Sequence, residues 1–241
     1  MARFAWGGAL LCGCVLLLGG CIHSTKPVFV RHYGLGGAEP AAATAGLASP
    51  SRRKILQVTS ISVPPWLSGT GMVYRLDYRD DGRLSTYGRS NWVAPPATLL
   101  EPLIQNTLAA AGTWRAVVGP GSLATADASL HLQLDDFSQA FAQPDRSTGI
   151  LDATATLIDN HDGNVIAQKH FRIEVAAATP DAQGGAKALG EASRKFATRL
   201  QQWLQAVDRR REPPANTGNV GRVSTRRSHT AMPRRVKTRP T

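Results

Sequence analysis

Apolar and polar residues alternate along several short stretches between residues 54 and 176. For example, leucines at positions 130, 132 and 134 alternate with polar residues. A period of two predicts strands with one buried face. The pattern predicts strands over 55–63, 72–78, 84–90, 114–118, 129–137, 150–158 and 165–175.

Two turn-rich segments join neighbouring strands of this set. Residues 80–83 read Asp-Asp-Gly-Arg, and residues 159–164 read Asp-Asn-His-Asp-Gly-Asn. Segments of this composition connect antiparallel strands in hairpins. The sheet is therefore expected to be mostly antiparallel.

Two longer segments carry apolar residues at spacings of three and four, which is the helical period. The first begins at Pro95 and Pro96 and ends at Gly112, and the second spans 181–207. Gly184 and Gly185 weaken the first turn of the second helix. Together with the strands, these segments predict an α+β (mixed α/β) fold, a small, mostly antiparallel mixed sheet flanked by two long helices.

The first 21 residues have the layout of a secretory signal. Arg3 precedes an apolar run over 4–18, and Leu18-Gly19-Gly20-Cys21 follows. This ending resembles the bacterial lipobox, in which the signal is cut before a cysteine that is then acylated. The alternative is a transmembrane helix of about 20 residues, but five glycines between positions 7 and 20 weaken a helix. We interpret 1–20 as a signal peptide and Cys21 as the site of lipid attachment.

Cysteine usage agrees with this interpretation. The chain has three cysteines, and Cys12 and Cys14 lie within the signal. Cys21 is then the single cysteine of the mature chain, so acylation leaves no thiol for a disulfide, and the domain must be stabilised by its core. In enteric bacteria, Asp after the acylated cysteine retains a lipoprotein in the inner membrane. Ile22 therefore favours the periplasmic face of the outer membrane.

The positive charge is concentrated at the C-terminus. The whole chain carries a net charge of +11, and residues 209–241 contain ten Arg or Lys against one acidic residue. The remaining body is nearly neutral, which argues against nucleic acid as a partner because such folds place a basic stripe on the domain itself. We expect a disordered basic tail over 209–241, either without a fixed partner or weakly attached to an anionic surface such as lipid or cell-wall polymer.

The expected organisation has four parts. They are the signal peptide over 1–20, the acylated cysteine with an early strand and a Gly, Ala and Pro-rich linker over 21–53, the folded domain over 54–208 and the basic tail over 209–241.

Motifs for catalysis or cofactor binding are absent from the sequence. No Gly-x-Ser-x-Gly elbow occurs, and Asp135 and Asp136 are expected on opposite faces of a strand. His131, His161 and His170 lack the spacing of a metal site. We expect a non-enzymatic protein without a catalytic site, metal or cofactor.

Aromatic residues stand beside prolines and turns at two places. Trp66 follows Pro64-Pro65, and Trp92 precedes Pro95-Pro96. Such rings often pack in the core, and the alternative is an exposed apolar patch for a partner or lipid. Under that alternative, Trp66, Met72 and Trp92 form the partner-binding surface of a homo-oligomer or docking collar.

Several of these segments together resemble the ABC-type transport auxiliary lipoproteins, the PqiC/YmbA-like family. The resemblance covers about residues 21–207 and includes the final helix. Trp66 stands where the family often has Tyr. The segments are the lipobox, Arg31-His32-Tyr33-Gly34-Leu35, Val63-Pro64-Pro65-Trp66-Leu67, Met72-Val73-Tyr74-Arg75, Trp92-Val93-Ala94-Pro95-Pro96 and Leu130-x-Leu-x-Leu-Asp135-Asp136-Phe137.

The resemblance implies a fold similar to the amino-terminal domain of TolB. It also implies partners, namely an MCE-domain protein and its ABC permease and ATPase, which move lipids between the two membranes. The lipoprotein then acts at the outer-membrane end. The competing interpretation is an envelope binding or assembly lipoprotein that contacts the cell wall or outer-membrane machinery through its basic tail.

Overall fold

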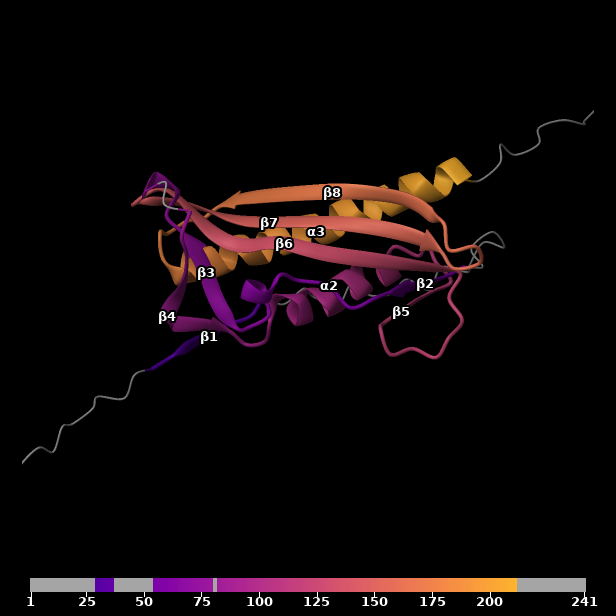
Figure 1. Cartoon of the computed structure of the whole chain (residues 1–241), viewed down its shortest axis with the longest axis horizontal. Helices are drawn as coiled ribbons and strands as arrows, with labels where there is room; N and C mark the ends of the chain where they lie inside the picture. The colour runs from indigo at the N-terminus through magenta and orange to yellow at the C-terminus, as the bar shows by residue number, and fades with distance from the viewer. Residues whose placement is uncertain (1–28, 37–53, 80–81, 212–241) are drawn as a thin grey trace, which may run out of the picture.

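The computed structural model describes residues 29–36, 54–79 and 82–211 (Figure 1). It confirms a mixed α/β fold with one eight-stranded sheet and two long helices. The elements are β1 (Arg31–Tyr33), β2 (Ile55–Val58), the short 3-10 helix η1 (Pro65–Leu67), β3 (Gly71–Arg75), a second 3-10 helix η2 (Asp77–Arg79), β4 (Leu84–Trp92), α2 (Pro96–Ala110), β5 (Ala116–Val118), β6 (Ala128–Gln143), β7 (Arg146–Asp159), β8 (Val165–Ala176) and α3 (Ala182–Arg211).

Strand β6 is the centre of the sheet. It pairs antiparallel with β7, which pairs antiparallel with β8. Along its other edge, β6 pairs in parallel first with β2 and then with β3. Strands β4 and β1 extend the β3 side, and β5 extends the β2 side. The long pairings are thus antiparallel, as expected, while the short strands add parallel pairings.

The helices cover one face of the sheet and bury its apolar side chains. Helix α3 runs behind β6, β7 and β8, and α2 lies beside it (Figure 1). Phe171 of β8 meets Phe196 of α3 edge to face, with ring centroids 5.4 Å apart. Strand β1 lies at one end of the long axis and the end of α3 at the other (Figure 1).

Three expected strands are shorter in the structure, at β2, β3 and β5, and three are longer by two or more residues, at β4, β6 and β7. Strand β2 ends at Val58, and the chain beyond Arg75 turns into η2. Strand β6 continues to Gln143, because its pairing with β7 resumes beyond a register shift between Leu134 and Asp136. Helix α3 continues to Arg211, three residues beyond the expected end of the domain.

The first turn of α3 is well formed despite its glycines. The Gly184 N–H donates to the Asp181 carboxylate over 2.7 Å, which caps the helix. This hydrogen bond is the main cause of a lowered pKa at Asp181. A Cβ at Gly185 would lie 2.0 Å from Oε1 of Gln139, so the glycine allows the helix to approach this side chain closely.

Gly185→Ala is therefore expected to lower the free energy of unfolding by about 1 to 3 kcal/mol, the usual cost of overpacking a core. Gln139 cannot move aside easily, because it is 1% exposed and bonded on both sides. Urea unfolding measures the change. Gly69→Ala is the control, since a Cβ there meets nothing within 4 Å. Equal stability of the two variants would show that the Gln139 side chain moves aside to accommodate the added methyl group.

A buried chain of polar groups surrounds Gln139. The Tyr87 hydroxyl donates to its Oε1 over 2.9 Å, and its Nε2 donates to the Ser147 hydroxyl over 2.7 Å. Burial, followed by the charges of Tyr74 and Asp181, raises the pKa of Tyr87 from 10.0 to about 12. Tyr87 is therefore a neutral donor at physiological pH.

The raised pKa predicts a loss of stability in alkali. The unfolded chain releases the Tyr87 proton at the lower pKa. The contribution of protonated Tyr87 to the free energy of unfolding is therefore fully present below pH 10.0 and is lost as the pH rises to about 12. We expect the free energy of unfolding to fall more steeply across this range in the wild type than in Tyr87→Phe. Parallel slopes in urea titrations at each pH would contradict the assignment.

Candidate functional site

The predicted contact residues occupy different environments. Trp66 is 39% exposed, but Met72 and Trp92 are 2% and 1% exposed. The expectation of one exposed surface is therefore wrong for Met72 and Trp92, which belong to the core. The Trp92 ring lies 5.4 Å from that of Phe137, between centroids. Cys21 lies outside the described residues.

Trp66 borders an open groove of about 530 Å³ on the β3–β4 hairpin. The groove combines apolar walls with polar and basic groups. Its other lining residues are Val73, Tyr74, Arg83, Leu84, Ser85 and Thr86. Among the three residues predicted for contact, Trp66 alone is thus available at a surface that a ligand can reach.

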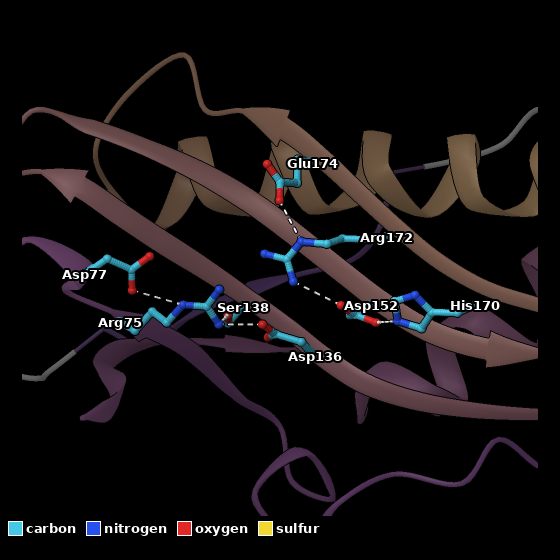
Figure 2. A network of polar contacts seen from close by, with 8 residues as sticks. All are labelled: Arg75, Asp77, Asp136, Ser138, Asp152, His170, Arg172 and Glu174. Atoms are coloured by element: carbon cyan, nitrogen blue, oxygen red, sulfur yellow. Dashed lines mark hydrogen bonds and ion pairs between the residues drawn. The ribbon is translucent and has the colours of Figure 1, made fainter. Parts of the chain in front are cut away.

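A polar network occupies the sheet face that points away from the helices (Figure 2). Leu151 and Ala153 of β7 are buried in the core, so Asp152 between them lies on the opposite face. It accepts a hydrogen bond from Arg172 over 3.0 Å and contacts His170, both on β8. Arg172 also donates to Glu174 over 2.8 Å, and this bond is the main cause of the raised pKa of Arg172.

The second part of the network joins β3 to β6. Arg75 forms an ion pair with Asp136, contacts Asp77 over 3.1 Å and donates to the Ser138 hydroxyl over 3.2 Å. The other oxygen of Asp136, Oδ1, is buried without a hydrogen-bond partner. Arg75 therefore compensates a carboxylate that water reaches poorly.

The register shift in β6 changes the expected placement of the two adjacent aspartates. Asp136 is the partner of Asp152 across the strands, and Asp135 also approaches Asp152 and His170. Both carboxylates thus reach one side of the sheet, which corrects the expectation of opposite faces. A bulge places two residues opposite one and so removes the strict alternation.

Asp135, Asp152 and His170 offer ligand atoms within 4.8 Å of one another. Sequence spacing did not group them, because they lie on three different strands, β6, β7 and β8, which meet only in the folded sheet. Each group already has a protein partner: Asp152 contacts His170 and Arg172, and Asp135 accepts from Gln133 over 2.6 Å. These contacts describe an ion-pair and hydrogen-bond network.

The network predicts that its two arginines contribute unequally to the free energy of unfolding. Arg75→Met should cost about 3 kcal/mol, because it leaves the Asp136 charge uncompensated in a largely buried position; side-chain exposures are 23% for Arg75 and 14% for Asp136. Arg172→Met should cost no more than about 1 kcal/mol, since Arg172 is 48% exposed and Asp152 retains His170.

Urea unfolding of both variants measures this difference. Adding Asp136→Asn to Arg75→Met should recover part of the loss, because the buried charge is then removed. Equal losses in the two single variants, or no recovery in the double variant, would contradict the proposed role of Arg75.

Within the part of the chain that the structure describes, none of the helices combines the length and the apolar character needed to cross a membrane.

Comparison with solved structures supports the fold. Protein XCC0632 from Xanthomonas campestris superposes with a TM-score of 0.60 at 19% sequence identity, covering 75% of this chain and 94% of its own. An uncharacterized protein superposes with a TM-score of 0.56 at 15% identity, covering 73% of this chain and 99% of its own. At these identities the likeness shows the fold alone. A search of curated proteins finds no match.

The family model agrees with the extent of this fold. The model of the ABC-type transport auxiliary lipoprotein component matches residues 33–201, from the end of β1 to the last third of α3. The matched region includes all strands from β2 to β8, helix α2 and the first two thirds of α3. This chain belongs to the ABC-type transport auxiliary lipoprotein family.

Proposed function

We propose that this protein is the non-catalytic, outer-membrane-anchored lipoprotein of an MCE/ABC-type system that transports lipids between membranes. Membership of the auxiliary lipoprotein family, over residues 33–201, is the observation that carries the proposal. The acylated Cys21 holds the domain at the periplasmic face of the outer membrane. The partners are an MCE-domain protein and its ABC permease and ATPase, and the lipoprotein acts as a homo-oligomer.

The structure supports an auxiliary role through the character of its polar groups. The acidic, basic and histidine side chains on the open sheet face are matched with one another rather than arranged around a free nucleophile. Exposed Trp66 and its groove offer a contact surface beside the hairpin.

Affinity purification of the full-length protein from cross-linked envelopes tests this function. We expect an MCE-domain protein, a permease and an ATPase to be enriched above a tagged lipoprotein of another family. Sedimentation of the detergent-purified protein tests the oligomer. Enrichment of cell-wall or outer-membrane assembly proteins without the transport subunits would contradict the proposal.

A second function has support from the basic tail. Residues 212–241, the part of the tail beyond α3, contain seven of the 28 Arg and Lys residues of the chain. An assembly lipoprotein bound to anionic cell-wall polymer requires this tail. Truncation after Arg211 would then abolish cell-wall retention, whereas a transport auxiliary would keep its partners.

A further inference from the structure

The exposed hydrophobic side chains of the described residues are unevenly distributed. Six of the eight large ones belong to the first part of the domain, between the approach to β1 and the residue after β4. These six define what we call the anchor-end surface. They are Phe29, Val30, Trp66, Tyr78, Leu84 and Val93, with exposures from 39% to 81%.

The elements that carry this surface gather at one end of the molecule. The six residues lie in β4 or in the segments that adjoin β1, β3 and β4. These three strands lie together at one end, while β6, β7, β8 and α3 extend toward the other (Figure 1). The Val93 N–H donates to the carbonyl of Tyr33, so the residue after β4 lies beside the end of β1. Trp66 and Leu84 line one groove. The exposed apolar groups therefore lie along one strand: Trp66 and Leu84 near the start of β4, and Val93 beside β1 at its other end.

The length of the tether determines which end of the molecule can reach the membrane. Eight peptide units separate Cys21 from Phe29, and at about 3.4 Å per residue they span at most about 27 Å. The 30 residues of α3 run along the long axis, a distance of about 45 Å at 1.5 Å per residue. The end with β1 must therefore remain near a membrane that holds Cys21.

The chemistry of the anchor-end surface suits the boundary between lipid and water. Trp and Tyr combine an apolar ring with a polar tip and are enriched at the level of the headgroups. The Arg79 guanidinium lies 5.8 Å from the centre of the Tyr78 ring, and guanidinium groups bind phosphate well. Leu84, Val93 and Phe29 add purely apolar area.

From the tether and this chemistry we propose that the anchor-end surface lies on the lipid bilayer that holds Cys21, with Trp66 at the level of the headgroups. The proposal rests on the anchoring at Cys21 in the proposed function. It assigns the exposed hydrophobic end to lipid, so a second copy or an MCE partner contacts other surfaces of the domain.

Quenching of tryptophan fluorescence by brominated lipid tests this contact. The mature chain from Cys21 to Thr241 is coupled through its single thiol to a maleimide phospholipid in phosphatidylethanolamine and phosphatidylglycerol vesicles, with or without bromine on the acyl chains. Coupling makes the test independent of acylation in the cell. Trp66 is the exposed tryptophan among the described residues, so bromine should quench mainly its emission.

Trp66→Phe should therefore lose most of the bromine-dependent quenching. The matched control is Trp203→Phe, which removes a half-buried ring of α3 that packs 6.0 Å from Phe171 and should retain the quenching. Circular dichroism verifies that both variants are folded.

Quenching that is the same in the wild type and Trp66→Phe would overturn the proposal. So would a change in sedimentation or in capture of the MCE partner by Trp66→Phe with lipid quenching unaltered, since the surface would then be a protein interface. Failure of acylation in cells would contradict the anchoring at Cys21. The quenching experiment would still test the lipid contact, because it attaches the lipid chemically.

Discussion

Trp92→Ala is expected to lower the free energy of unfolding by about 3 to 5 kcal/mol, the range for deleting a large buried aromatic side chain. Trp92 is 1% exposed, and its ring packs against Phe137 at the centre of the sheet. In a domain of this size such a loss lowers the melting temperature by roughly 10 °C. Urea unfolding and thermal circular dichroism measure both quantities.

Two controls identify the physical cause. The indole nitrogen of Trp92 is buried without a hydrogen-bond partner, so Trp92→Phe removes volume but no hydrogen bond and should cost much less than alanine. Trp66→Ala should change stability little, because its side chain is 39% exposed. If Trp66→Ala were as destabilising as Trp92→Ala, the division into a surface ring and a core ring would be wrong.

The burial of Trp66 and Trp92 could not be predicted from the residues around them. Both stand near a pair of prolines, and both are followed by an apolar residue. Their different burial depends on pairing between distant strands: Trp92 ends β4, which lies between β1 and β3, whereas Trp66 is in a short 3-10 helix between β2 and β3. Single-sequence patterns do not contain that pairing.

The elements themselves followed from periodicity. The apolar positions of α2 and the alternation in β7 and β8 depend on neighbouring residues only, and the structure places each element close to its expected range. The parallel pairing of β2 and β3 along one edge of β6 was not predicted. It joins residues 72 apart for β2 and 65 apart for β3, and their register depends on the folded sheet.

The polar network required the same long-range information together with a local irregularity. Asp152 and Arg172 are outward-facing charged residues on adjacent strands, and a pairing register would have brought them together. The bulge at Asp135 is harder to predict, because its only local sign is the two adjacent aspartates between Leu134 and Phe137, and the register shift itself depends on pairing with β7. Its effect is to place two carboxylates where regular pleating allows one.

Glycine in α3 illustrates how packing reverses a propensity. Gly184 and Gly185 disfavour helix by about 1 kcal/mol each relative to alanine. In the structure, a Cβ at Gly184 would lie 2.1 Å from the carbonyl oxygen of Thr179, and one at Gly185 would meet Gln139. Close approach of α3 to the preceding loop and to the sheet therefore requires the residues that intrinsic propensity disfavours.

Cys21→Ser is expected to abolish incorporation of radiolabelled fatty acid and to release the protein from the membrane fraction. Each buried methylene contributes about 0.8 kcal/mol to membrane binding, and two or more acyl chains are needed for a stable anchor. Cys12→Ser is the matched control, because Cys12 precedes the expected cleavage site and the single cysteine of the mature chain is retained. Labelling of Cys21→Ser at the wild-type level, or loss of label in a stably produced Cys12→Ser variant, would contradict attachment at Cys21. A labelled control and an unlabelled, soluble Cys21→Ser variant would instead identify the residue from which the tether to the anchor-end surface is measured.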